Sequence, residues 1–173
     1  MADNTDTSTA GTPTAAHENS VSPAEESRLR VSGVIETTLC CRDLAAAETF
    51  YRKILNFDVF AKEEGRHLFL RCGNSMLLLF NPEHTSVTVT EVDDIPIPLH
   101  GTTGAGHVAF RANEDEIEHW KQRLGEHGVE IESDVVWPEG GRSIFFRDPS
   151  GNCLEFTTPR TWGLPAEGPL RRA

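Results

Sequence analysis

The feature that most restricts how this chain can fold is a pattern of elements that occurs twice along the sequence. Each copy reads as one strand, then one helix, then three further short strands, and the two copies occupy residues 33–82 and 106–160. A pattern repeated over such a distance indicates a duplicated supersecondary unit, and one unit alone cannot bury its own apolar face. The sequence therefore predicts a single α+β domain, residues 33–160, made of two paired βαβββ modules.

Local signals in the first copy support this interpretation. Residues 34–41 have the composition and alternation of a strand, and Asp43 stands where a helix N-cap is expected. A helix is predicted from Leu44 to Leu55, with an apolar stripe along one side and Asn56 at its end. The three remaining strands of this copy are predicted at residues 57–61, 66–71 and 75–80.

The second copy repeats these signals in the same order. A strand is predicted at residues 107–112, followed by Asn113 and Glu116 in the positions of a capping box and by a helix that ends before Gly128. The last two strands of this copy flank a turn from Asp148 to Asn152, whose Pro, Gly, Asp and Asn residues are typical of tight turns. The three later strands are predicted at residues 129–136, 142–147 and 153–157.

Three segments lie outside the two copies. Residues 1–32 are rich in Thr, Ser, Ala and acids, and a segment of this composition cannot bury enough surface to offset its loss of entropy, so it is predicted to be a disordered tail. The connector, residues 83–105, holds several prolines and glycines, and the sequence predicts no helix there and at most one strand, near residues 87–92. Residues 161–173 form a C-terminal extension.

Superposition of the two copies places polar residues at equivalent positions. Aligning the first strands pairs Glu36 with His107, and aligning the ends of the copies pairs Leu78 with Glu155. In each of these strands the polar residue lies on the face opposite the apolar alternates. If the two units shared one concave surface, Glu36, His107 and Glu155 would converge there. The alternative is that both glutamates are ordinary exposed strand residues.

Three stretches of this sequence carry a family resemblance: D-L-A-A-A-E-T-F-Y-R-K-I-L-N-F, G-H-V-A-F and F-R-D-P-S-G-N-C-L-E-F. Together with the repeat, they resemble the vicinal oxygen chelate superfamily, which includes glyoxalases, extradiol dioxygenases, fosfomycin resistance enzymes and bleomycin-binding proteins. The resemblance implies that the paired βαβββ modules form a curved, barrel-like mixed sheet around a metal cavity. It also implies a homodimer.

Position by position, the resemblance makes Glu36, His107 and Glu155 the ligands of one divalent metal ion. The first strand of this family often carries His or Gln where Glu36 stands, and Leu78 replaces a ligand found in glyoxalase I. Extradiol dioxygenases also use an active-site Tyr, whereas the only Tyr of this chain, Tyr51, is placed on a predicted helix.

One imidazole and two carboxylates form a hard, oxygen-rich donor set, which suits Fe²⁺, Mn²⁺, Ni²⁺, Co²⁺ or Zn²⁺. The predicted function is a metal-dependent enzyme that acts on a small oxygen-rich organic molecule by lyase, isomerase or dioxygenase chemistry. Glu36 or Glu155 is a candidate base. The alternative is a metal-free protein that binds and sequesters a small molecule, as the bleomycin-binding branch of the family does.

Three further side chains are candidates for substrate binding. Arg111 and Arg147 project from the same strand faces as His107 and Phe145, respectively. They could bind a substrate carboxylate, or could instead form salt bridges at the rim of the sheet. His67 could face the same cavity, or could be a structural histidine.

The charge and the cysteines limit the partners and the compartment. A net charge of −11 and a pI near 5.0 argue against nucleic acid or an anionic membrane as a partner. No apolar run is long enough to cross a bilayer, and the N-terminus has no basic segment followed by an apolar one. The four cysteines form no recognisable disulfide framework, so free thiols in the cytoplasm are expected.

Overall fold

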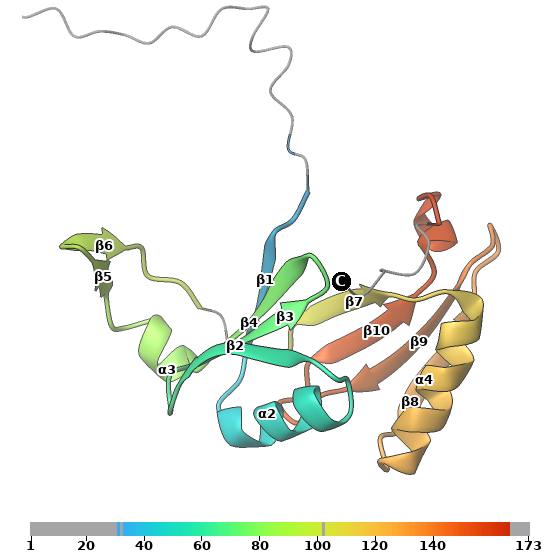
Figure 1. The fold of residues 1–173 in the computed structure, drawn as a ribbon, viewed down its shortest axis with the longest axis horizontal. Coiled ribbons are helices and arrows are strands. Elements are labelled where there is room, and N and C mark those ends of the chain that lie inside the picture. The colour runs from blue at the N-terminus through green and yellow to red at the C-terminus, as the bar shows by residue number, and fades with distance from the viewer. Residues whose placement is uncertain (1–30, 32, 102, 167–173) are drawn as a thin grey trace, which may run out of the picture. The chain divides into compact units, whose positions relative to one another are not determined.

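The computed structural model describes residue 31, residues 33–101 and residues 103–166 of the chain (Figure 1). A compact unit begins at Val34. The predicted disordered tail, residues 1–32, lies outside the described residues except for Val31. The first module contains β1 (Glu36–Cys40), α2 (Leu44–Lys53), β2 (Asp58–Glu63), β3 (His67–Cys72) and β4 (Ser75–Phe80).

The second module repeats this order of elements. It contains β7 (His107–Arg111), α4 (Glu114–Glu126), β8 (Ile131–Val136), β9 (Arg142–Arg147) and β10 (Cys153–Thr157), and a 3₁₀ helix, η1 (Pro159–Trp162), follows it. Both helix starts form as predicted: Asp43 accepts a hydrogen bond from the Ala46 amide, and Asn113 and Glu116 make a reciprocal capping box. No helix among the described residues is long and apolar enough to span a membrane.

The connector differs from its prediction. It contains a short helix, α3 (Pro82–Thr85), and a two-stranded hairpin, β5 (Thr90–Val92) and β6 (Ile95–Ile97), where at most one strand was expected. The helix forms because the Asn81 side chain caps the Glu83 amide and Pro82 occupies the first turn, where a missing N–H costs nothing. The hairpin closes through Asp93 and Asp94, which both adopt positive φ.

Each module forms its own four-stranded sheet, with the orders β1-β4-β3-β2 and β7-β10-β9-β8. In both sheets the first and last strands of the module are parallel neighbours, and Glu36 pairs with Met76 as His107 pairs with Cys153. A register shift also occurs at the equivalent place in both, between β2 and β3 and between β8 and β9. The predicted repeat is therefore confirmed strand by strand.

The predicted α+β class with paired βαβββ modules is confirmed, but their strands form two sheets rather than one. The two sheets are separate and do not close into a barrel, because β1 and β7 each have a single hydrogen-bonded neighbour strand in the described part of the chain. The modules instead share a hydrophobic core, in which the rings of Phe57 and Phe110 pack with their centroids 5.4 Å apart. Ile35, which precedes β1, remains 76% exposed.

A buried polar cluster also joins the two modules. The Tyr51 hydroxyl of α2 donates to Asp148 Oδ2 at 2.9 Å, and Asn152 Nδ2 donates to the same oxygen and to the carbonyl of Cys40. Asn152 Oδ1 accepts from the amide of Gly106, directly before β7. The turn from Asp148 to Asn152 thus fixes the starts of β7 and β10 against the end of β1.

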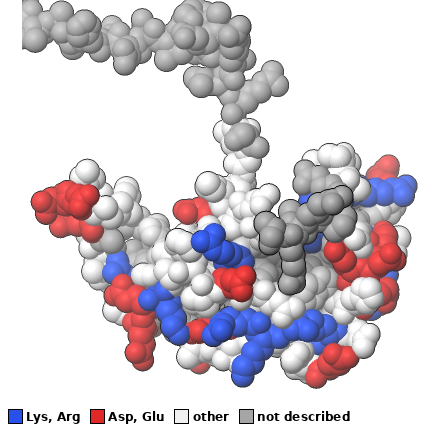
Figure 2. Space-filling view, viewed as in Figure 1, with Lys and Arg blue, Asp and Glu red and all other residues white. Residues whose placement is uncertain are grey.

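Charged side chains are unevenly placed on the surface (Figure 2). The tip of the β5–β6 hairpin carries Glu91, Asp93 and Asp94, which form a small acidic group on an otherwise apolar hairpin. No disulfide forms, and all four cysteines are free thiols as predicted.

Candidate functional site

His107 and Glu155 meet on the face of the second sheet that is opposite α4 and the core. Their strands β7 and β10 are parallel neighbours, and the register places Glu155 beside Ala109, one pleat along from His107. Nε2 of His107 lies 3.2 Å from Oε2 of Glu155. The side chain of Glu155 is only 9% exposed, whereas the side chain of His107 is 51% exposed. The structure therefore brings together two of the three predicted ligands.

The backbone determines how the His107 ring can act. Nδ1 of His107 lies 3.0 Å from the carbonyl oxygen of Cys153. Because a carbonyl can only accept a hydrogen bond, Nδ1 carries a proton, and in the neutral ring Nε2 then presents a lone pair. That lone pair faces a carboxylate oxygen, so a cation, either a proton or a metal ion, has to lie between these two acceptors. An imidazole oriented by a carbonyl through its other nitrogen is typical of metal-binding histidines.

The side chains around this pair come from β9 and the segment after β8. Phe145 lies opposite Glu155 in the register, and its ring is stacked 6.3 Å from that of His107. One pair further along the same face, Ser143 Oγ and Thr157 Oγ1 are 2.9 Å apart, and Trp137 Nε1 donates to Ser143 Oγ at 2.9 Å. The face is thus apolar next to the pair and hydroxyl-rich at one end.

The two predicted arginines have different surroundings. Arg147 makes a bidentate ion pair with Glu132, with distances of 2.9 and 3.0 Å, and also donates to the carbonyl of Gly151. Arg111 makes no ion pair with the described residues, and its Nη1 donates to the carbonyl of Pro165 at 3.1 Å. Arg147 therefore forms a salt bridge at the rim of the sheet. The positive charge of Arg111 is not neutralised by a carboxylate of the described residues and can bind an anionic ligand.

Glu36, Leu78 and His67 lie in the first module, on the face of its sheet opposite α2. Glu36 is exposed, Leu78 is buried, and the ring of His67 stacks on Phe69 with a centroid distance of 4.2 Å. Burial lowers the pKa of His67, although the carboxylate of Glu63 acts in the opposite direction. His67 therefore has the surroundings of a structural histidine.

Within the described residues, no three His, Cys, Asp or Glu side chains come close enough together to hold a metal ion. Glu36 thus does not join His107 and Glu155 inside one chain. Its role as a ligand stays a prediction.

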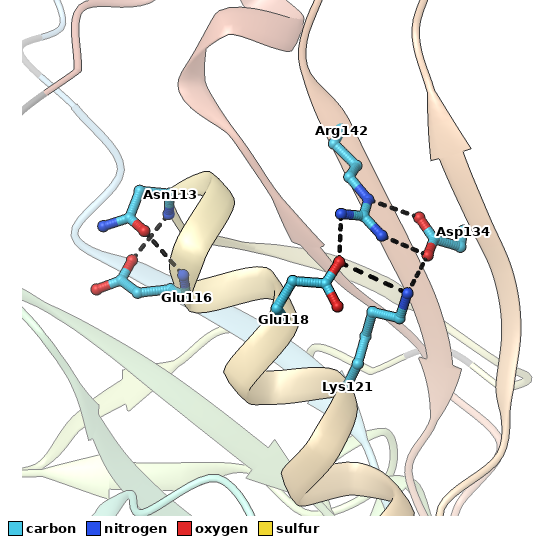
Figure 3. A network of polar contacts seen from close by, with 6 residues as sticks. All are labelled: Asn113, Glu116, Glu118, Lys121, Asp134 and Arg142. Carbon is cyan, nitrogen blue, oxygen red and sulfur yellow. Dashed lines mark hydrogen bonds and ion pairs between the residues drawn. The ribbon is translucent and has the colours of Figure 1, made fainter.

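Several positioning residues were not found from the sequence. Arg142 follows the Gly140-Gly141 turn and links three elements: its guanidinium donates to both oxygens of Asp134, at 2.8 and 2.6 Å, and to Glu118 on α4 (Figure 3). Lys121 also reaches Asp134, at 2.6 Å. This network fastens β8 and β9 to α4 behind the site. In the sequence, the one local pattern that marks this position is G-G-R-S at residues 140–143, where two glycines precede Arg142.

The same turn receives the C-terminal extension. Gly141 has a φ of +97°, and a Cβ atom there would lie 2.5 Å from the backbone nitrogen of Thr161. Only glycine allows this approach, which lets η1 lie against the β8–β9 turn and lets Thr161 contact Thr157 at 3.2 Å. Trp162, on η1, is 73% exposed.

Comparison with known proteins identifies the family. Residues 33–156 match the model of the Glyoxalase/Bleomycin resistance protein/Dioxygenase superfamily, and the chain belongs to this superfamily. The resemblance predicted from the sequence is therefore confirmed.

Individual relatives are similar over most of their length. The chain is 28% identical over 126 residues to the fosfomycin resistance protein FosX of Listeria monocytogenes, which covers 72% of this chain and 88% of that protein. It is 26% identical over 130 residues to the metallothiol transferase FosB of Bacillus licheniformis, covering 75% and 77%. Among solved structures, lactoylglutathione lyase from Agrobacterium tumefaciens is 38% identical, with a TM-score of 0.72, and covers 79% of this chain and all of that one.

Proposed function

We propose that this protein is a divalent-metal enzyme in which Glu36, His107 and Glu155 hold the metal. The observation that carries the proposal is the buried Glu155 carboxylate, whose only polar partner among the described residues is Nε2 of His107. A buried carboxylate is costly unless a cation accompanies it. A strand glutamate with a purely structural role would not need an imidazole held in place by the Cys153 carbonyl.

The donor set fits a metal of the first transition series. One imidazole nitrogen and two carboxylates suit Fe²⁺, Mn²⁺, Co²⁺, Ni²⁺ or Zn²⁺, and three protein ligands leave coordination positions for a substrate. When bound, the ion would supply Lewis-acid stabilisation of a developing oxyanion. The chain's own contribution is orientation: the Cys153 carbonyl sets the tautomer of His107, and Phe145 limits the approach of water on one side.

The third ligand comes, in this proposal, from a second copy of the chain. Glu36 stands on β1 and His107 on β7, and each of these strands is an edge of its sheet. Val34 and Ile35, directly before Glu36, are 75% and 76% exposed. A homodimer in which β1 of one chain meets β7 of the other would cover these side chains and complete the site.

The substrate class proposed is a small oxygen-rich molecule. The relatives named above are a fosfomycin resistance protein, a metallothiol transferase and a lactoylglutathione lyase, and these names favour lyase, isomerase or related group-transfer chemistry. Dioxygenation is less favoured, because extradiol dioxygenases use an active-site tyrosine. Tyr51, the only tyrosine of the chain, is instead buried in the core and hydrogen-bonded to Asp148.

The exposure and the partners of each side chain suggest its role in the proposed site. Arg111 would bind an anionic group of the substrate, since Arg147 already pairs with Glu132. Glu155, being buried, suits a metal ligand, and the exposed Glu36 is the better candidate if one carboxylate also acts as a base.

A metal-free binding protein is the second candidate. It is favoured by one observation, namely that the described part of a single chain contains no cluster of three ligands. In that case Glu155 and a protonated His107 would form an ion pair that orients a ligand.

Metal analysis separates the two candidates. The untagged protein, purified without chelators and reconstituted with each candidate metal, is expected to bind close to one ion per chain. Glu155→Ala should lose the ion, whereas Glu64→Ala, which removes an exposed carboxylate from the β2–β3 turn, should keep it. A wild-type protein that binds no metal, or a Glu155→Ala variant that binds as much as wild type, would contradict the proposal.

A further inference from the structure

The hairpin of the connector has one apolar face. In its antiparallel register Val92 lies opposite Ile95, and Glu91 lies opposite Pro96. Opposed residues point to the same side and neighbours alternate, so Val92, Ile95 and Ile97 share one face while Glu91 and Pro96 share the other. The apolar face is in solvent, with Val92 57%, Ile95 66% and Ile97 40% exposed.

This exposure extends through the segment that carries the hairpin. Val87, Val89 and Leu99 are also 70%, 50% and 51% exposed. A two-stranded hairpin is at best marginally stable by itself in water. This one closes through Asp93 and Asp94, with φ values of 50° and 63°, where Asn and Gly are the usual residues. A clustered apolar face on an otherwise weak hairpin indicates a surface that is covered in the assembled protein.

We propose that the apolar face of the β5–β6 hairpin packs against a second copy of this chain. The connector lies on the face of the first sheet that bears Glu36, since the ring of His100 stands edge-on to Phe80 at 4.7 Å, and Phe80 pairs with Cys40 on that face. The hairpin therefore extends from the side of the module that meets the other copy in the shared site. The choice of a second copy rests on the proposed function.

Charge supports the same occupant. The acidic tip formed by Glu91, Asp93 and Asp94 would repel the tip of another hairpin, so the hairpin has to meet a different part of its partner (Figure 2). Each copy offers Arg71, which stacks over the ring of Phe60 and makes no ion pair with the described residues. The acidic tip of the hairpin and an arginine that has no carboxylate partner in the described part of its own chain are complementary in charge.

The test compares two lysine substitutions on opposite faces of the same hairpin. In sedimentation velocity over a range of concentrations, the full-length wild-type chain is expected to be a dimer. Ile95→Lys should raise the dimer dissociation constant at least about tenfold, because it buries a charge in the interface. Pro96→Lys places the same charge on the other face and should change the dissociation constant much less. Amide hydrogen exchange across residues 88–99 should slow with dimerisation in wild type.

Two results would overturn the proposal. One is a monomeric wild-type protein at every concentration. The other is a dimer whose dissociation constant does not respond to Ile95→Lys and whose amides in residues 88–99 exchange freely. Metal content is measured on the same samples, so a hairpin-dependent dimer that binds no metal would contradict the metal site alone. A metal-binding dimer indifferent to the hairpin would contradict this inference alone.

Discussion

At the scale of single residues, one backbone carbonyl determines what His107 can do. The carbonyl of Cys153 accepts a hydrogen bond from Nδ1–H, and Nε2 is then directed at Glu155. The sequence could predict that both side chains share a face, because strand alternation is regular. It could not predict this contact, since it depends on the parallel register that places Cys153 beside His107. The position of Glu36 likewise depends on how the modules meet, which no local pattern encodes.

Tyr51 offers a residue-scale test of the cluster that joins the modules. Its hydroxyl is fully buried and donates to Asp148 Oδ2, and burial, with Asp148 beside it, raises the pKa of Tyr51 well above its ordinary value. Tyr51→Phe removes one donor from a buried carboxylate, so we expect the free energy of unfolding to fall by about 1–3 kcal/mol.

The measurement is urea denaturation of wild type and variant, with Thr49→Val as the control. That substitution removes an exposed hydroxyl from the same helix and should leave the midpoint nearly unchanged. If Tyr51→Phe were as stable as wild type, the cluster would not contribute to joining the modules.

At the scale of elements, local patterns predict the regular parts of this fold well. Caps, apolar stripes and turn residues place both helices and eight of the strands within about two residues of their observed ends. They do not predict the one register shift that occurs between paired strands in each sheet. The connector is different because its hairpin is closed by two aspartates in an uncommon conformation rather than by Asn-Gly. Its valines and isoleucines show no helical periodicity and no continuous strand alternation. Only the register of the hairpin shows that they share one face.

The attachment of α4 to β8 and β9 predicts a dependence of stability on pH. Hydrogen bonds from Arg142, with Lys121 in support, lower the pKa of Asp134 below its ordinary value of 3.8. A group whose pKa is lower in the folded state adds stability above its unfolded pKa, and this stability is lost as the pH falls through the folded pKa. The contribution of the network should therefore be complete at pH 7 and decline below about pH 4.

Arg142→Ala is the variant that tests this dependence. At pH 7 it should lower the free energy of unfolding by about 1–2 kcal/mol, since the bidentate pair is partly buried. The difference from wild type should shrink on going to pH 3. Arg52→Ala, which breaks an exposed pair with Glu48 on α2, is the control and should cost only about 0.3–0.5 kcal/mol. A difference for Arg142→Ala that is the same at both pH values would contradict the assignment to Asp134.

At the scale of the whole molecule, the two modules are alike in topology and unlike in chemistry. The second module presents His107 and Glu155, whereas the first presents Glu36 together with Leu78 at the position equivalent to Glu155. Duplication explains the common register, and in the proposed site Leu78 leaves Glu36 as the single ligand from the first module. The family and the α+β class could be predicted from the sequence, but the separation into two open sheets could not, because it depends on contacts between edge strands.

The proposal that two chains share each site can be tested by mixing two variants that each lack one ligand. Glu36→Ala and His107→Ala should each bind no metal as homodimers. When they are unfolded together and refolded, each mixed dimer should contain one site with all three ligands intact, because Glu36 comes from one chain and His107 and Glu155 come from the other. We predict that metal binding returns to one ion per mixed dimer. If the mixed dimers form and bind no metal, all three ligands act within one chain or not at all, and the shared site is wrong.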